Sequence, residues 1–109
     1  MTFGEYQKLS RKTAQYPKIG ESFVYPVLGL AGEAGEVAEK IKKLFRNKNG
    51  DLSQEYKLEI AKELGDVLWY LSQISTELNL SLEEVAQLNL EKLLDREKRG
   101  VIKSEGDNR

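Results

Sequence analysis

Apolar residues recur at helical spacing along most of the chain, and residues typical of helix ends interrupt the recurrence. Four segments result, at about 2–16, 25–46, 53–78 and 82–98. In the second segment an apolar stripe runs from Val27 to Phe45, and in the third from Ile60 to Leu78, with the three-to-four-residue spacing of one helix face. No segment alternates apolar and polar residues as a strand does. The pattern predicts an all-α chain folded as a four-helix antiparallel bundle.

Capping residues set the boundaries of these helices. The expected N-terminal signals are Thr2 with Glu5 as a capping box, Pro26 in a first turn, Asp51 or Ser53, and Ser81 with Glu84 as a second capping box. The expected C-terminal signals are Tyr16-Pro17, Asn79 and Gly100. We therefore expect residues 1–109 to form a single domain, with 100–109 as a flexible polar tail.

Two carboxylate motifs, Glu33-Ala-Gly-Glu36 and Glu63-Leu-Gly-Asp66, lie at equal distances from the turn sequence at 49–51. Each motif spaces its acids three residues apart, so both acids share one helix face. In an antiparallel hairpin about that turn, Glu36 faces Glu63 and Glu33 faces Asp66, about 20 Å from the turn at 1.5 Å per residue. Both motifs also lie on the same flank of the apolar stripes. Four converging carboxylates would repel one another, and a divalent cation would neutralise them.

A solvated helix face is the alternative reading of these acids, because pairs such as Glu36 and Lys40 at i, i+4 stabilise exposed helices. The glycines inside the motifs favour the metal site. Gly35 and Gly65 each cost roughly 1 kcal/mol in a helix interior relative to alanine, which indicates close approach by a partner helix or a ligand. For Gly29, tight helix packing is the preferred explanation.

Composition narrows the kind of site and the kind of protein. The chain has 109 residues, no cysteine and no histidine, so an all-oxygen site selects Mg²⁺, with Mn²⁺ as a substitute. A net charge of −1 argues against a nucleic-acid-binding surface. No apolar run reaches membrane-spanning length, and the N-terminus does not look like a secretion signal. We expect a cytoplasmic protein with no membrane and no nucleic-acid partner.

Two runs, Gly29-Leu-Ala-Gly-Glu-Ala-Gly-Glu-Val37 and Glu63-Leu-Gly-Asp-Val-Leu-Trp-Tyr70, with the downstream Asn89-Leu-Glu-Lys92, carry a family resemblance. The chain resembles the MazG-like, all-α nucleoside triphosphate pyrophosphohydrolases, which cleave nucleotides between the α- and β-phosphates. The resemblance implies that the four acids of the motifs bind Mg²⁺ and that Tyr70, Asn89 and Lys92 contact substrate sugar or phosphate. Many relatives have two consecutive acids where this chain has Gly32-Glu33, which leaves open an extra role in water activation or in holding a further Mg²⁺.

The residues themselves fit phosphoanhydride hydrolysis. Glu36 or Glu33 could accept the proton of the attacking water. Lys92, Arg96 and Arg99 could bind the leaving pyrophosphate, although for Arg96 a solvated helix charge is the preferred reading. Lys40 and Lys43 could meet phosphates or simply solvate the helix surface.

The remaining expectations concern the substrate, the class of function and the assembly. The pyrophosphohydrolase could act on (deoxy)nucleoside triphosphates in nucleotide-pool control, on phosphoribosyl-ATP, or strictly on dUTP. A non-catalytic helical interaction module is the rival of another class. Leu58, Leu68 and Trp69 widen the apolar surface of the third helix beyond what one partner helix needs, so we expect a homo-oligomer, a dimer or tetramer whose second copy completes the nucleotide pocket.

Overall fold

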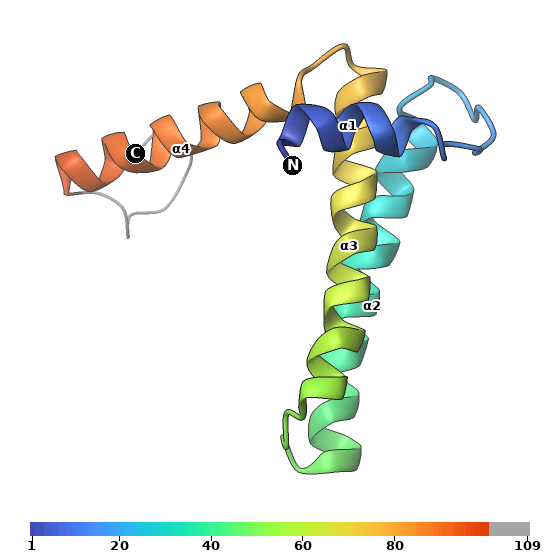
Figure 1. Cartoon of the computed structure of the whole chain (residues 1–109), viewed down its shortest axis with the longest axis vertical. Helices are drawn as coiled ribbons and strands as arrows, with labels where there is room; N and C mark the ends of the chain where they lie inside the picture. Colours follow the sequence, from blue (N-terminus) through green and yellow to red (C-terminus); the bar gives the residue numbers. More distant parts are fainter. Residues whose placement is uncertain (101–109) are drawn as a thin grey trace.

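The computed structural model describes residues 1–100, which form four α-helices and, within that range, no strand (Figure 1). The helices are α1 (Phe3–Arg11), α2 (Val24–Lys48), α3 (Gln54–Glu77) and α4 (Leu82–Arg99). The all-α prediction is confirmed. None of these helices is both long and apolar enough to cross a membrane. The flexible tail expected after Gly100 lies outside the described residues.

The first helix begins as predicted and ends earlier. Thr2 and Glu5 form the expected capping box, with both hydrogen bonds at 3.0 Å. The helix stops at Arg11 rather than near Tyr16. Tertiary contacts take up the residues that follow, since the Trp69 indole N–H donates to Thr13 Oγ1 at 2.8 Å and the Tyr16 hydroxyl donates to the Glu77 carboxylate. These contacts hold the segment after α1 against α3.

The connection between α2 and α3 is a tight turn of the predicted kind. Asn49 and Gly50 both adopt left-handed backbone conformations, with φ of 52° and 76°. Of the two candidate caps, Ser53 is the one used, because its hydroxyl accepts a hydrogen bond from the Tyr56 amide at 3.1 Å. The later boundaries also agree with the prediction. Asn79 (φ 58°) follows α3, Gly100 (φ 72°) caps α4, and Ser81 supplies its half of the second capping box.

The helices α2 and α3 form a long antiparallel hairpin, and α1 crosses the end of α3 that is remote from the turn (Figure 1). Where α1 crosses α3, the two helices contact each other through polar side chains. Ser72 and Gln73 are fully buried, the Ser10 and Ser72 hydroxyls lie 3.0 Å apart, and Gln73 Nε2 donates to Ser10 Oγ at 3.1 Å. Because all these polar groups find partners, their burial is not a net cost and instead fixes the crossing position.

The fourth helix corrects the prediction of a four-helix bundle. It contacts α1 and α3 only near its own start, and then projects away from the hairpin, with α2 out of reach (Figure 1). The radius of gyration is 16.8 Å, whereas a compact chain of this length would have about 13 Å. Within one chain, the antiparallel arrangement therefore holds for the α2–α3 hairpin and does not extend to a closed bundle.

Candidate metal centre

Carboxylates from α2 and α3 converge midway along the hairpin. Carboxylate oxygens of Glu33, Glu63 and Asp66 lie within 4.8 Å of one another. Glu33 and Glu63 are half-buried and Asp66 is exposed. The mirror spacing of the motifs about the turn explains this convergence, because equal distances along antiparallel helices give equal heights. The structure thus brings three of the four predicted acids together.

The fourth acid, Glu36, lies one helical turn nearer the connection between α2 and α3. It is exposed, and it is not part of the group of three carboxylates that approach within 4.8 Å. Its charge nevertheless acts on that group, because it is one of the charges that raise the pKa of Glu33. Glu36 therefore stands at the edge of the cluster, beside the three convergent acids.

Electrostatic repulsion is the main property of this cluster. The pKa of Glu33 is raised above its ordinary value of 4.5, first by burial, and then by the charges of Asp66, Glu63 and Glu36 and by a hydrogen bond with Glu63. Each of these effects favours the neutral acid over the carboxylate. A cation bound at this position would reverse the effect, because its charge stabilises all the carboxylates at once.

The donor set fits a hard divalent cation. All three groups offer oxygen, and the chain contains no histidine or cysteine that would favour zinc. Opposite ligands of Mg²⁺ lie about 4.2 Å apart, twice the usual Mg–O distance. The oxygens of the cluster, which lie within 4.8 Å of one another, are close to the spacing that one such ion requires. Glu33, Glu63 and Asp66 could therefore hold Mg²⁺ or Mn²⁺.

Aromatic residues line the side of the cluster that faces α1. The Trp69 and Tyr70 rings meet edge to face at 5.1 Å, Tyr16 meets Trp69 at 6.1 Å, and Tyr16 stacks on Tyr25 at 5.6 Å. Burial raises the pKa of Tyr70, and Tyr25, Glu33 and Asp66 raise it further. Tyr70 therefore lies between the aromatic group and the acids.

Gly29 makes room for this tyrosine. A Cβ atom at position 29 would lie 2.2 Å from Tyr70 Cε1, so only glycine lets the ring pack against α2. Tight packing was the preferred explanation for this glycine. Gly35 and Gly65 differ, because a Cβ atom at either position would meet nothing within 4 Å. Within one chain, the partner helix does not approach them.

A network of charged and polar groups anchors the aromatic residues. Arg11 donates to Tyr16, Gln73 and Glu77 at 2.8, 3.2 and 3.1 Å. The hydrogen bond from Tyr16, and after it the Arg11 guanidinium, lowers the pKa of Glu77 despite its partial burial. Sequence reasoning missed Tyr16 and Tyr25 as parts of this side of the site. Their signal was weak, since both lie in or beside a loop with no helical periodicity.

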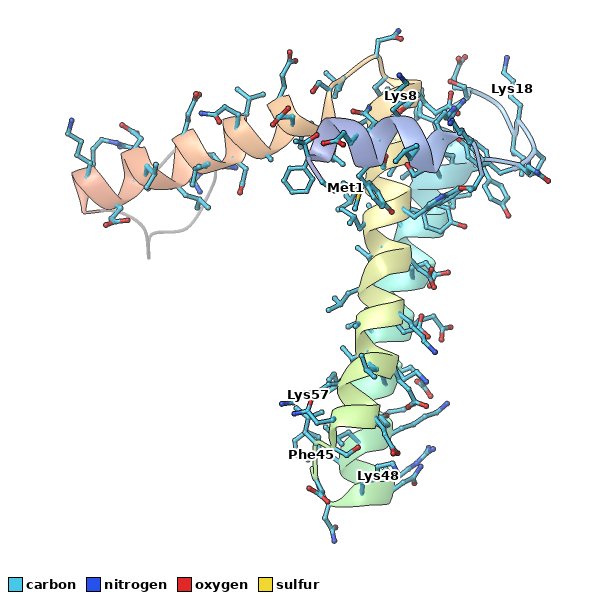
Figure 2. The ribbon with its side chains drawn as sticks, viewed as in Figure 1. Met1, Lys8, Lys18, Phe45, Lys48 and Lys57 are labelled. Atoms are coloured by element: carbon cyan, nitrogen blue, oxygen red, sulfur yellow. The ribbon has the colours of Figure 1, made fainter. Side chains whose placement is uncertain are left out.

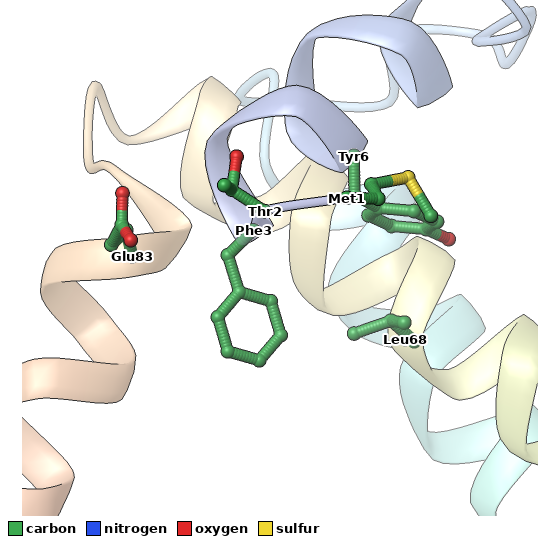
Figure 3. Close-up of a pocket in the computed structure, with 6 residues that line it drawn as sticks. All are labelled: Met1, Thr2, Phe3, Tyr6, Leu68 and Glu83. Atoms are coloured by element: carbon green, nitrogen blue, oxygen red, sulfur yellow. The ribbon is translucent and has the colours of Figure 1, made fainter.

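A cavity of about 340 Å³ opens where α1, α3 and the start of α4 meet (Figure 3). Phe3, Tyr6 and Leu68 project into it (Figure 3). Burial raises the pKa of Tyr6, and the charge of Asp66 adds to the effect. The cavity is therefore within electrostatic range of the acid cluster, on a second side of α3.

The predicted substrate contacts on α4 lie away from the acids of the same chain. Asn89 and Lys92, with Val85 and Leu88, line an open groove of about 500 Å³ on α4. Arg99 Nε donates to the Asp95 carboxylate at 2.8 Å, at the far end of that helix. Since α4 projects from the hairpin, one chain does not bring these residues to the cluster.

Arg96 differs from its expected solvated state, because only 3% of its surface is exposed.

Comparison with known proteins identifies the family to which the chain belongs. The model of the MazG nucleotide pyrophosphohydrolase domain matches residues 25–101, a range that contains both carboxylate motifs and α4. The Gene 37 protein of Mycobacterium phage L5 is 46% identical to this chain in an alignment 109 positions long that covers 95% of this chain and 96% of that protein. No solved structure matches the chain significantly. The chain belongs to the MazG nucleotide pyrophosphohydrolase domain family.

Proposed function

We propose that this protein is a Mg²⁺-dependent nucleoside triphosphate pyrophosphohydrolase, which cleaves (deoxy)nucleoside triphosphates to monophosphates and pyrophosphate. Family membership suggests nucleotide pyrophosphohydrolase activity. The single observation that carries the proposal is the convergence of Glu33, Glu63 and Asp66 within 4.8 Å. Control of the cytoplasmic nucleotide pool is the corresponding biological role.

The four acids would have different roles in hydrolysis. A divalent cation held by Glu33, Glu63 and Asp66 would neutralise phosphate charge during the reaction. Glu36 stands outside that group and is exposed, so it is the better placed of the two candidate bases to accept a water proton. The water oxygen forms a bond to one phosphorus of the α–β anhydride, and the bond from that phosphorus to the bridging oxygen breaks. The bridging oxygen keeps the electron pair and leaves with the other phosphate group.

A panel of nucleoside and deoxynucleoside triphosphates tests this proposal, assayed with Mg²⁺ and then Mn²⁺. The expected products are a monophosphate and pyrophosphate. Release of orthophosphate and a diphosphate would contradict α–β cleavage. Turnover of dUTP alone, or of phosphoribosyl-ATP alone, would assign the narrower alternatives. A protein that hydrolyses none of them and is indifferent to Mg²⁺ would be the non-catalytic helical module.

The assembly we propose is a homo-oligomer, a dimer or a tetramer. The flank of the hairpin opposite the acids, here called the apolar flank, consists of Val27, Ile41 and Phe45 on α2 with Leu64 and Leu71 on α3. These residues lie roughly 120° around each helix from the acids, at 100° per residue, and all five are exposed; Phe45 is 65% and Leu64 53% exposed. An apolar surface that extends along both helices is uncommon on a monomer and typical of a protein interface.

A second copy could also complete the nucleotide site. Leu88 on α4 is 66% exposed, and it lines the same groove as Asn89 and Lys92. An α4 that packs against a neighbouring chain could bring these polar residues to the acid cluster of that chain, which they do not reach in their own chain. Light scattering at micromolar concentration tests the assembly. A mass near 12.4 kDa with activity retained would contradict both the oligomer and the shared pocket.

A further inference from the structure

Lys40 and Glu59 form an ion pair across the hairpin, one turn beyond the acid cluster. Lys40 Nζ lies 4.0 Å from Glu59 Oε2. Lys40 follows Glu36 by four residues and Glu59 precedes Glu63 by four, so the pair lies about 6 Å nearer the α2–α3 connection than Glu36 and Glu63, on the same flank. The Tyr56 hydroxyl donates to the Lys40 carbonyl and fixes the two helices at this height. The chain therefore places an ammonium group on the acid flank, one helical turn from the carboxylate cluster.

The flank that carries the acids is chemically different at its two ends. Toward α1 lie Tyr70, Trp69, Tyr16 and Tyr25, whose rings contact one another. Toward the connection, Lys40 and Lys43 follow the acids on the same side of α2, and the end of the hairpin as a whole is rich in lysine, with Lys48 and Lys57 labelled there in Figure 2. Aromatic rings suit a nucleobase, whereas ammonium groups suit phosphates. A nucleoside triphosphate therefore fits this flank in one direction, with its base toward α1.

We infer that Lys40 binds the terminal phosphates of the nucleotide, and the pyrophosphate product, beside the acid cluster. The inference rests on the proposed function. A triphosphate carries more negative charge than one divalent cation neutralises, so its outer phosphates need a further cation. A lysine side chain spans about the 6 Å of axial rise between the pair and the cluster. The Lys40 partner, Glu59, is exposed, and an exposed pair at 4.0 Å is weak enough to open for a phosphate.

The neighbouring lysines are less suited to this role. Lys42 is 2.8 Å from Glu39 of its own helix, and its position on α2 turns it away from the acids at 100° per residue. Lys43 pairs with Glu39 as well, at 3.7 Å, and lies almost one turn farther from the cluster. Lys62 is exposed and stands on the outer edge of α3. Lys40 is the one of these four that lies between the two helices, where a nucleotide spanning both acid motifs would also lie.

Lys40→Met tests the inference, with Lys42→Met as the matched control on the same helix. Because a hydrogen bond to a charged group is worth about 1.5–3 kcal/mol, we expect Lys40→Met to raise both the KM for the triphosphate and the inhibition constant of pyrophosphate at least about tenfold. The Mg²⁺ dependence should stay unchanged. Lys42→Met should stay within about twofold of the wild type. Equal effects of the two lysine variants would overturn the inference, since they would reflect general surface charge.

Glu59→Gln separates phosphate binding from a structural role of the ion pair. This variant breaks the same pair but keeps the ammonium group. If Lys40 binds phosphate, Glu59→Gln should leave pyrophosphate inhibition within about twofold and Lys40→Arg should restore most of the binding. An equal loss in Glu59→Gln and Lys40→Met, with a matching fall in Tm, would show that Lys40 acts only through the pair. A loss in Lys62→Met but not in Lys40→Met would assign the phosphates to Lys62.

Calorimetry of pyrophosphate with the Mg²⁺-loaded protein keeps the inference separate from the proposed activity. Binding of pyrophosphate that is weakened by Lys40→Met supports the inference whether or not the protein turns over a triphosphate. Wild-type protein that hydrolyses triphosphates but shows the same pyrophosphate affinity with and without Lys40 would overturn the inference and leave the proposed function intact. Wild-type protein that binds no pyrophosphate would also overturn it.

Discussion

The two flanks of the α2–α3 hairpin have opposite chemistry although the same helical periodicity produces both. One flank carries Glu33, Glu63 and Asp66, whose charges repel one another. The apolar flank carries exposed side chains such as Phe45 and Leu64. Each flank favours a different kind of partner, because clustered carboxylates favour a cation and exposed apolar side chains favour another apolar surface. The comparison teaches that residue spacing alone can place two binding chemistries on one hairpin, and the proposed metal site and the proposed oligomer interface follow from these two chemistries.

The largest expected effect is loss of activity when the acid flank loses a ligand. Asp66→Asn removes one carboxylate from the cluster and should lower kcat/KM at least about a hundredfold, because even indirect partners of metal ligands typically contribute 10–100-fold. The folded structure should survive, since Asp66 is exposed and its removal relieves repulsion. Circular dichroism checks the fold, and initial rates at saturating Mg²⁺ check the activity. Glu36→Gln should likewise abolish activity without unfolding the helices. Near-normal turnover in both variants would disprove the four-acid site.

The next effect concerns the apolar flank. Leu64→Asp places a charge in the proposed interface and should weaken self-association about a hundredfold or more, because burial of a leucine is worth about 1.5–3 kcal/mol and an isologous interface contains the residue twice. Leu58→Asp is the matched control, because Leu58, which the sequence placed in the apolar surface expected to form the oligomer, lies outside the apolar flank in the structure. Leu58 is 65% exposed on another face of the same helix, so its change should leave the assembly intact. Sedimentation over a concentration series distinguishes them, and equal behaviour of the two variants would place the interface elsewhere.

The contrast between the flanks also shows what the sequence could predict. Local signals gave the helices, the Asn49-Gly50 turn and the height at which Glu33, Glu63 and Asp66 meet, since each depends on residue spacing alone. The end of α1 was predicted too late, because hydrogen bonds of Thr13 and Tyr16 to distant residues determine it. Hydrogen bonds between residues far apart in the sequence produce no periodic pattern in it.

The position of α4 was also beyond local signals. Its caps and length were predicted well, yet the bundle expected from four amphipathic helices did not form within the chain. An amphipathic pattern indicates that the apolar face of α4 packs against another apolar surface, but it does not identify whether that surface belongs to the same chain or to a second one. The aromatic residues Tyr16 and Tyr25 were missed for a related reason, because the loop between α1 and α2 contains Tyr16 and determines where Tyr25, in the first turn of α2, meets it.

A smaller effect, on the free energy of unfolding, is expected at two glycines of α2 that have different surroundings. Gly29→Ala would place a Cβ atom 2.2 Å from the Tyr70 ring, and overpacking of this kind typically costs about 1–3 kcal/mol. Gly35→Ala meets open space in the chain, so it should stabilise the helix by roughly 1 kcal/mol. Chemical denaturation of both variants measures whether each substitution lowers or raises the free energy of unfolding. A destabilised Gly35→Ala variant would mean that a second chain approaches α2 closely at that position.

The smallest expected effect is on the pH dependence of stability, and two carboxyl groups should show it with opposite signs. The pKa of Glu33 is raised by burial and by the neighbouring acids, so the folded protein binds this proton more tightly than the unfolded chain does. Without metal, Glu33 therefore costs stability as pH rises above its ordinary pKa of 4.5. The pKa of Glu77 is lowered by Tyr16 and Arg11. Its contribution is present above 4.5 and is lost as pH falls through the lowered value.

Two glutamine variants separate these contributions in chelator-treated protein. At neutral pH, Glu33→Gln should raise Tm because it removes the repulsion, whereas Glu77→Gln should lower Tm because it removes an ion pair and weakens a hydrogen bond. The gain from Glu33→Gln should shrink as the pH falls toward 4.5, and the loss from Glu77→Gln should disappear only below it. Added Mg²⁺ should stabilise the wild type more than Glu33→Gln, since the carboxylate that repels its neighbours without metal becomes a ligand when metal binds. A Glu33→Gln variant that is less stable without metal and responds fully to Mg²⁺ would mean that the acid flank is an ordinary solvated surface.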